Sequence, residues 1–387
     1  MDEPRRRFRV TLLDTFFGDN TFEFCRAVAD FAEPRRHWRL LGSIGFSPFS
    51  PWAAVPWGEV DGFMGIDMNA AMADLAVRKR VATVSVAPRD PDTPLAHVTS
   101  DYRAVGAMGA EHLLARGYAH YAYIGENSWP SAQQREGFTQ TLRAAGRTCL
   151  TTTLTARTTA AITKQVRGWL AEFPKPIAIM TAMDYLARYT VNVAVDMGLR
   201  VPGDVGVLGV NDNRWASIMA AVPISSIRLD ERRLGQVAAR TLETLMRGGA
   251  APPLQIVPPL QVVTRRSTDT ILSQDPLVAA ALDFIRDHAE EGIDVEDVLV
   301  EVQCSRSTLE KRMKGELGYT VHTAITRARV EKVKKMLVGT EVSTEQIAHH
   351  CGFEHQARLF ETFKRVTGMT PAAYRRSMRN AGPADAM

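Results

Sequence analysis

The sequence has few cysteines and no long apolar run. Its four cysteines, among 387 residues, are far apart and form no C-x-x-C pair, which argues against a disulfide scaffold and against a zinc ribbon. No apolar run reaches the ~18 residues that a membrane helix needs. Arg5, Arg6 and Arg7 lead into a short β-like run instead of the apolar core of a secretory signal. These absences predict a cytoplasmic protein without membrane contact.

Catalytic motifs are also missing. Residues 8–267 contain no G-x-G-x-x-G, no P-loop, no G-x-S-x-G and no H-E-x-x-H, the patterns that would place phosphates, a serine nucleophile or a zinc ion. The nine histidines show no spacing typical of metal ligands. The sequence therefore predicts a protein that is not an enzyme and that holds no cofactor and no metal ion.

Charge is unevenly distributed along the chain, although the formal net charge is only +4. Residues 304–380 hold 15 Lys and Arg against 7 Asp and Glu, whereas residues 273–303 hold one Arg against nine acidic residues. A basic block beside an acidic one is typical of a DNA-facing surface with a solvated opposite face. Two ordinary solvated surfaces would give the same counts, so both interpretations stay open on charge alone.

Short apolar runs alternate with helical stretches over residues 8–267. Strands are expected at 8–14, 38–42, 60–66, 81–86, 97–101, 120–125, 148–154, 177–183 and 205–211, and helices at 21–32, 101–117 and 131–146. Near-continuous apolar runs fit parallel strands that are buried on both faces, and their alternation with helices fits α/β layers. Because these units are too many for one sheet of ordinary size, we expect two lobes.

The composition changes at residues 267–275, and only helical periods follow. Helices are expected at 276–289, 295–302, 307–317, 321–338, 344–351, 356–366 and 371–378. The predicted domains are an α/β domain over 1–268 and an all-α domain over 275–380, followed by a tail at 381–387. A short helix, a tight turn and a basic helix occur twice in the all-α domain, at about 294–317 and about 343–366. These are two candidate helix–turn–helix units.

The first unit shows a buried stripe and a possible cap in its second helix. Ser307 and Glu310 have the spacing of a capping box. Leu309, Met313 and Leu317 fall on one face of the helix. A structural helical hairpin would look similar to this unit taken alone.

The second unit repeats these features. Ser343 and Gln346 form a second capping-box pattern, and Ile347 and Ala348 are expected to face inward. Gly352 supplies the turn, and the buried stripe is expected at Leu359, Phe363 and Val366. The side chains left for DNA are small, polar or basic, as the major groove accepts. They are Arg306, Ser307, Thr308, Lys311 and Lys314 in the first unit, and Gln356, Arg358, Lys364 and Arg365 in the second.

Residues 347–376 resemble the AraC/XylS-type DNA-binding domain. The shared pattern is carried by Ile347, Ala348, Gly352, Phe353, Phe363, Lys364, Gly368, Thr370, Pro371, Tyr374 and Arg375. The resemblance implies two recognition helices in successive major grooves, with Lys and Arg contacts to phosphate. Glu361 stands where members of the family often carry Arg or Lys, so this unit either docks more loosely or accepts a hydrogen bond from a cytosine.

Three stretches of the α/β part, at 97–125, 177–213 and 224–248, resemble the LacI-type effector domain, which has the fold of periplasmic binding proteins. The N-terminal DNA-binding headpiece of LacI-type repressors is not expected, since a strand begins at Phe8. A sensor of this type joined to an AraC-type domain is the combination of bacterial xylose operon regulators. The resemblance implies a homodimer that binds promoter repeats in DNA, D-xylose as the sugar effector, and RNA polymerase as a partner.

In this fold the chain crosses between the lobes three times, and the ligand lies at the carboxyl ends of the strands. The loops at those ends give the predicted sugar ligands, which are Asp19, Asn20, Asp101, Arg135, Asp184, Asn211 and Asp212, with Phe16 and Trp129 as apolar platforms. Arg135 is one residue out of register with the sugar-binding Arg of the family. Asn211 stands where the family often has Asp, which exchanges an acceptor for a donor.

Each of these residues also has a structural alternative. Asp101 and Asp184 follow strands and precede helices, where an N-cap is common. Arg135 fits a surface ion pair, and Phe16 and Trp129 fit a core better than they fit a stacking platform. These alternatives stay open at the level of the sequence.

The sequence as a whole predicts a sugar-responsive DNA-binding transcription regulator that activates genes of xylose catabolism. A regulator of the same architecture that responds to another sugar is one alternative. A sugar-binding protein whose helical domain contacts protein is another, but it would be expected to carry a signal peptide and no basic recognition helices.

Overall fold

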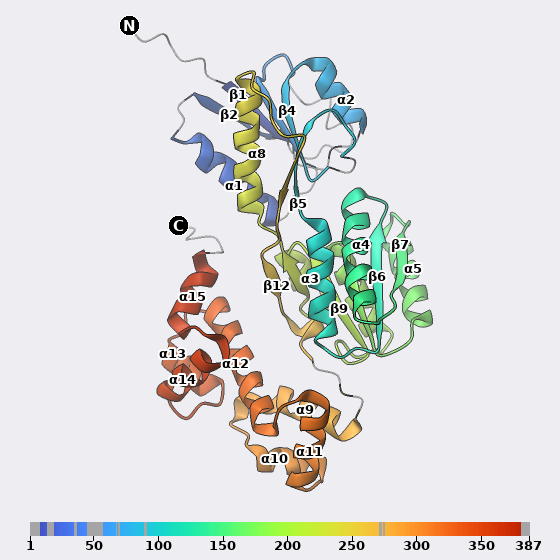
Figure 1. Cartoon of the computed structure of the whole chain (residues 1–387), viewed down its shortest axis with the longest axis vertical. Coiled ribbons are helices and arrows are strands. Elements are labelled where there is room, and N and C mark those ends of the chain that lie inside the picture. Colours follow the sequence, from blue (N-terminus) through green and yellow to red (C-terminus); the bar gives the residue numbers. More distant parts are fainter. Residues whose placement is uncertain are drawn as a thin grey trace. The chain divides into compact units, whose positions relative to one another are not determined.

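The computed structural model describes residues 8–13, 19–34, 37–44, 57–66, 68, 70–88, 91–270, 273 and 275–380. The chain divides into two compact units, Met1–Asp269 and Thr270–Met387. They are called the sensor unit and the helical unit below (Figure 1).

The sensor unit contains two six-stranded sheets. The first has the strand order β11-β5-β4-β3-β1-β2, made of β1 (Phe8–Leu13), β2 (Trp38–Ile44), β3 (Gly62–Ile66), β4 (Ala82–Val86), β5 (Ala96–Ser100) and β11 (Leu254–Val257). The second has the order β12-β10-β9-β8-β6-β7, made of β6 (His120–Glu126), β7 (Leu150–Leu154), β8 (Ile177–Thr181), β9 (Val205–Val210), β10 (Ser225–Arg228) and β12 (Gln261–Val263). Only the pairing of β10 with β12 is antiparallel among the pairings described.

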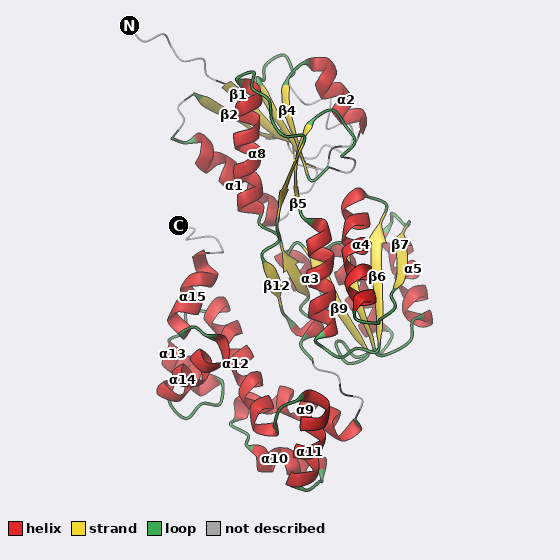
Figure 2. Cartoon of the chain, in the orientation of Figure 1, coloured by secondary structure: helices red, strands yellow, loops and turns green. Residues whose placement is uncertain are grey.

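Helices cover the faces of both sheets, as parallel strands require (Figure 2). They are α1 (Asp19–Ala32), α2 (Ala70–Lys79), α3 (Tyr102–Leu114), α4 (Trp129–Ala144), α5 (Thr159–Glu172), α6 (Asp184–Asp196), α7 (Arg214–Ile218) and α8 (Glu231–Met246), followed by the 3-10 turn η1 (Arg266–Thr268). Every residue of β8 and β9 is buried, which explains their unbroken apolar sequences. The predicted α/β architecture with two lobes is confirmed.

The chain passes between the two sheets three times: after β5, after β10, and between β11 and β12. Hydrogen bonds tie the crossings together. The Asp101 N–H donates to the Val257 carbonyl at 2.8 Å, and the Leu260 N–H donates to the Arg228 carbonyl at 2.9 Å. Because β5, β10 and β11 all end at the crossings, the carboxyl edges of both sheets lie next to this bonded bundle of segments.

Glycines bring α3 and α4 into backbone contact. A Cβ atom on Gly106 would lie 2.0 Å from the Gln134 carbonyl oxygen, and a Cβ on Gly137 would lie 2.0 Å from that of Arg103. Neither position can hold a larger residue without separating the helices. This contact holds the two helices together, although α3 follows β5 of the first sheet and α4 follows β6 of the second.

The helical unit contains two hydrophobic cores that share one long helix. Its elements are α9 (Pro276–His288), η2 (Ala289–Glu291), α10 (Val295–Val302), α11 (Arg306–Leu317), α12 (Val321–Gly339), α13 (Thr344–His350), α14 (Gln356–Thr367) and α15 (Pro371–Asn380). Helix α12 contributes Val321 and Ile325 to the first core, beside α10 and α11. It contributes Val333 and Leu337 to the second core, beside α13 and α14.

Three local predictions in this unit have clear outcomes. The capping box of Ser343 and Gln346 is confirmed. The predicted cap at Ser307 is wrong, because α11 begins earlier and Ser305 caps it by accepting from the Thr308 N–H at 3.4 Å. Leu359 and Phe363 are fully buried as expected, but Val366 is 41% exposed and lies outside the second core.

Candidate effector and DNA-binding sites

Polar residues gather where neighbouring strands of the second sheet end. Trp129 begins α4 after β6, Asp184 begins α6 after β8, and Asn211 and Asp212 follow β9. Since β6, β8 and β9 are adjacent and parallel, these residues share one edge. Asn211 and Asp212 have φ angles of 99° and 54°, a strained conformation for residues other than glycine that is frequent at functional sites.

Asp184 is fully buried at this edge and has two hydrogen-bond partners. Its carboxylate accepts from the Asn213 N–H at 2.6 Å and from the Ser226 hydroxyl at 2.7 Å. Burial raises the pKa of Asp184 to about 7, whereas the hydrogen bonds from Asn213 and Ser226 act in the opposite direction. The predicted alternative of an N-cap does not describe this residue, because Met183 is the N-cap position of α6.

Asp212 is held by two arginines. Its Oδ2 lies 2.6 Å from an Nη of Arg228, its Oδ1 lies 2.6 Å from an Nη of Arg265, and its side chain is 7% exposed. The Asp212 N–H donates to the Ser226 Oγ at 2.9 Å. Ser226 therefore joins Asp184 to Asp212, and the two carboxylates belong to one buried polar cluster.

The cluster continues to the last turn of the sensor unit through Arg265. The Arg265 carbonyl accepts from the Ser225 hydroxyl at 2.8 Å, and Thr268 donates to the Ser225 Oγ at 2.7 Å. The Nε2 of His112 lies 2.8 Å from the Thr268 Oγ1, and burial lowers the pKa of His112 to about 3, so the ring is neutral near pH 7. A continuous set of polar contacts thus runs from the strand ends to η1.

The other predicted sugar ligands are placed as follows. Asp101 is the N-cap of α3 and accepts from the Ala104 N–H at 2.9 Å. The Trp129 ring meets Tyr102 edge to face at 6.3 Å, and the side chain of Arg135 is exposed on α4. Asp19 and Asn20 lie in the first turn of α1, but their side chains, like Phe16 as a whole, are outside the described residues.

The sequence did not single out Ser226, Arg228 or Arg265. Ser226 and Arg228 lie inside the stretch at 224–248 that resembles the LacI-type domain, and this was the only available signal. Their partnership with Asp212 arises from strand pairing, since Ser226 is opposite Gly209 in the ladder of β10 and β9.

The predicted recognition helix of the first unit corresponds to α11, and its predicted DNA-contacting residues lie mostly at the surface. Arg306, Ser307, Lys311 and Lys314 are exposed and Thr308 is half-buried. Arg306 lies 3.2 Å from Glu296 of α10. Among the described residues, no hydrogen bond or ion pair engages the amino groups of Lys311 and Lys314.

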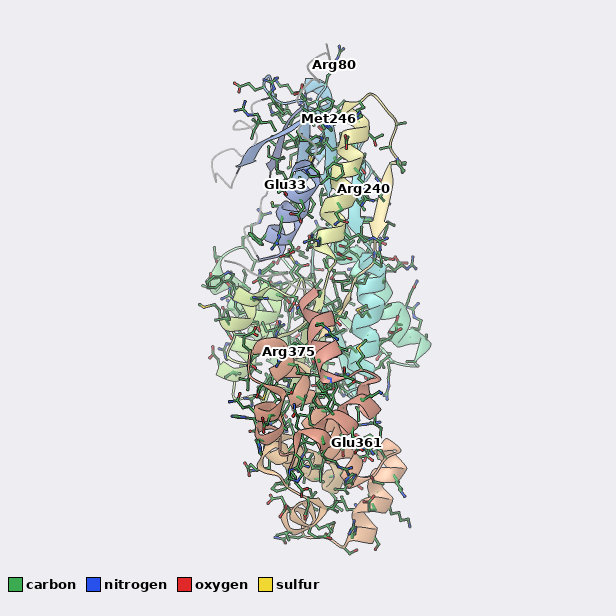
Figure 3. The ribbon with its side chains drawn as sticks, turned by 90° about the vertical axis from the view of Figure 1, so that its left-hand side faces the viewer. Glu33, Arg80, Arg240, Met246, Glu361 and Arg375 are labelled. Carbon is green, nitrogen blue, oxygen red and sulfur yellow. The ribbon has the colours of Figure 1, made fainter. Side chains whose placement is uncertain are left out.

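The predicted recognition helix of the second unit corresponds to α14. Its four predicted residues, Gln356, Arg358, Lys364 and Arg365, are exposed. Gln356 donates to the Thr344 Oγ1 at 2.5 Å. An Nη of Arg358 lies 3.3 Å from Glu361, which projects from the same helix (Figure 3).

Neither a metal site nor a membrane helix is found in the part of the chain that the structure describes. No group of three or more His, Cys, Asp or Glu there is placed to hold a metal ion. No helix there combines the length and the apolar composition that a membrane crossing needs.

Two family models match the chain. Residues 110–268 match a periplasmic binding protein-like domain, and residues 299–377 match a helix-turn-helix domain. The xylose operon regulatory protein of Escherichia coli (strain K12) is 34% identical over 212 residues, which are 54% of this chain and 54% of that protein. Over this stretch the chain is similar to a bacterial xylose operon regulatory protein.

The xylose operon regulatory protein of Haemophilus influenzae is 27% identical over 288 residues, covering 72% of this chain and 74% of that protein. The match to the Escherichia coli protein spans about half of its length. A solved structure described as the xylose-binding transcription activator xylR aligns with 96% of this chain and 98% of its own, at 24% identity and a TM-score of 0.69. The two relatives are named as operon regulatory proteins and not as enzymes, and they confirm the predicted resemblance to xylose operon regulators.

Proposed function

We propose that the chain is a sugar-responsive transcription regulator, which binds DNA through the helical unit and a sugar at the carboxyl edges of the sensor sheets. One observation carries the proposal: a periplasmic-binding-protein-like domain precedes a helix-turn-helix domain in a chain related to xylose operon regulatory proteins. Such a pairing gives a single chain a place for a small effector and a surface for DNA.

The proposed effector is D-xylose, after the names of these relatives. The strand ends supply planar polar groups for sugar hydroxyls at Asp184, Asn211 and Asp212, and an aromatic ring at Trp129. A carboxylate has about four acceptor positions, so Asp184 and Asp212 can bind hydroxyls while they keep their internal partners. Arg135, Asp101, Asp19, Asn20 and Phe16 remain predicted contacts.

The proposed mechanism is a shift between arrangements of the two lobes. A sugar that contacts both carboxyl edges favours the arrangement in which both contacts form, and the three bonded crossings are the segments about which the lobes would turn. In a homodimer this shift would change how four helix–turn–helix units meet promoter repeats, and hence how RNA polymerase is recruited for activation. The sugar can shift this equilibrium only by its difference in affinity for the two states.

The first experiment is thermal unfolding of the purified chain with a panel of pentoses and hexoses. A ligand at about 100 times its dissociation constant adds about 2.7 kcal/mol of stability, which is easily measured. A shift with D-xylose alone supports the proposal, and a shift with a different sugar keeps the regulator and changes its effector. No shift with any sugar would contradict the proposed effector class.

A DNA-binding measurement tests the other half of the proposal. The chain should bind duplex DNA with an affinity that falls steeply as salt rises, because Lys and Arg displace counterions from phosphate. If a sugar stabilises the chain but no duplex binds at low salt, the chain is instead a sugar-binding protein whose helical unit contacts protein.

A further inference from the structure

The two helix–turn–helix units are structurally equivalent at a constant separation in the chain. Helices α11 and α14 have 12 residues each and begin at Arg306 and Gln356. Each is followed by a C-cap glycine with φ of 74°, Gly318 or Gly368. A threonine hydroxyl caps each following helix, since Thr320 and Thr370 accept from the N–H groups of Thr323 and Ala373 at 3.2 Å each. Every position of α11 therefore has a counterpart 50 residues later in α14.

The buried counterparts are alike, and the exposed ones differ. Leu309 and Leu359 are both fully buried, as are Met313 and Phe363. The residue two positions after each of these leucines is exposed, and it is Lys311 in α11 and Glu361 in α14. The equivalent surface position thus has opposite charge in the two units.

The partner of Glu361 is Arg358, one helical turn earlier. Their side chains are 76% and 59% exposed and lie 3.3 Å apart. The equivalent position in α11 is Thr308. At this pair of positions the second unit presents a base and an acid, whereas the first unit presents a threonine and a lysine.

The chemistry of Glu361 restricts what it can contact in DNA. A carboxylate only accepts hydrogen bonds and is repelled by phosphate, so it gains nothing from the DNA backbone. In the major groove the donors are the amino groups of cytosine and adenine, and Glu pairs with cytosine N4, whereas the bidentate partner of adenine is Asn or Gln. Lys311, as a donor, suits phosphate or guanine instead.

We infer that Glu361 is a specificity-determining residue, which accepts a hydrogen bond from the N4 amino group of a cytosine in the half-site of the second unit. Arg358 is a positioning residue that holds the Glu361 carboxylate by their ion pair and offsets its repulsion by phosphate. This inference rests on the proposed DNA-binding function. It makes the two half-sites unequal in sequence even though the two units share one scaffold.

The test is selection of bound sequences from a pool of duplexes with a randomised central segment. The full chain is used, with and without D-xylose, in four forms: wild type, Glu361→Ala, Glu361→Gln and the matched control Lys311→Ala. Wild type should enrich one position for cytosine by about tenfold over other bases. Glu361→Ala should lose the preference at this position alone, and Glu361→Gln should move it toward adenine.

The controls separate this inference from the proposed function. Lys311→Ala should weaken overall binding and keep the cytosine preference. Arg358→Ala should reduce the preference and Arg358→Lys should restore part of it, an effect that a merely structural role would not produce. If Glu361→Ala enriches the same cytosine as wild type, the inference is wrong while DNA binding stands. If wild type enriches no sequence and binds no duplex at low salt, the proposed function itself fails.

Discussion

Carboxylates at the edge of the second sheet and charges on the recognition helices are held in opposite ways. Asp184 and Asp212 are buried, and their oxygens bond to neighbours from other elements. Arg358 and Glu361 form an exposed pair within a single helix. The difference teaches that the carboxylates at the sheet edge are held in place by several elements of the fold, whereas the exposed pair on the helix is held only by its own helix.

The largest expected effect is that of Asp212→Asn. It leaves Arg228 and Arg265 without their carboxylate in a site where each arginine is 24% exposed, so the sensor unit should lose about 3 kcal/mol of unfolding free energy. The measurement is urea unfolding of the full chain, monitored through a spectroscopic signal that comes from the sensor unit. Asp30→Asn is the control, because the pair of Asp30 with Arg232 is exposed and should be worth less than about 1 kcal/mol. Equal losses of unfolding free energy in the two variants would show that the buried pair stabilises the chain no more than the exposed one.

A smaller effect is expected in the pH dependence of stability. Burial raises the pKa of Asp184 from 3.8 to about 7, so between these values the folded chain keeps a proton that the unfolded chain has lost. This contribution to stability is complete below about pH 4 and is lost as the pH rises toward 7. The melting temperature should therefore fall less from about pH 5 to about pH 8 in Asp184→Asn than in wild type.

Asp204→Asn is the control for this slope. The hydrogen bond from Arg200 lowers the pKa of Asp204, so its titration lies below that range and the variant should keep the wild-type slope. If the melting temperature of Asp184→Asn changed with pH as that of wild type does, the pKa of Asp184 would not be raised by its burial.

On the recognition helices, Lys311→Glu should change DNA binding without changing stability. Loss of one phosphate contact reduces the slope of log affinity against log salt by about 0.9, and affinity at moderate salt should fall about tenfold. The unfolding free energy should change by less than about 0.5 kcal/mol, as for most exposed substitutions, and sugar binding should be unaffected. Unchanged DNA affinity and salt slope would show that α11 does not enter the groove.

The smallest expected effect is on the stability contributed by the pair of Arg358 and Glu361. A double-mutant cycle with Arg358→Ala and Glu361→Ala should give a coupling free energy of about 0.3–0.5 kcal/mol in thermal unfolding. A coupling as large as the loss from Asp212→Asn would mean that the exposed pair stabilises the helix and is not held for DNA.

Much of the fold could be predicted from the sequence because most strands are buried on both faces. The apolar runs at 81–86, 177–183 and 205–211 correspond to β4, β8 and β9. Strands β10, β11 and β12 were not predicted, since they have only four, four and three residues. In addition, β11 and β12 lie at sheet edges, where partial burial leaves no continuous apolar run.

The candidate effector site could be predicted only in part. Asp184 and Asp212 were found because they follow strands, and strand ends are visible in the sequence. Their partners Ser226 and Arg265 lie 42 and 53 residues away in the chain, at distances set by strand pairing. In the helical unit, by contrast, the spacing within each helix was enough to place the exposed basic residues, since helix geometry alone decides which face they occupy.

The shared helix α12 has a consequence for the DNA that the chain can use. It has 19 residues, which gives a length of about 28 Å, and it carries core residues of both helix–turn–helix units. Both units are therefore attached to one continuous helix, which is somewhat shorter than the 34–36 Å of one turn of B-DNA. Moving the half-sites apart by about half a turn would place one of them on the far side of the duplex. The second unit could not reach it while α12 stays one continuous helix. If both units bind one face of the DNA as proposed, the operator is expected to keep a fixed spacing, even where its bases change.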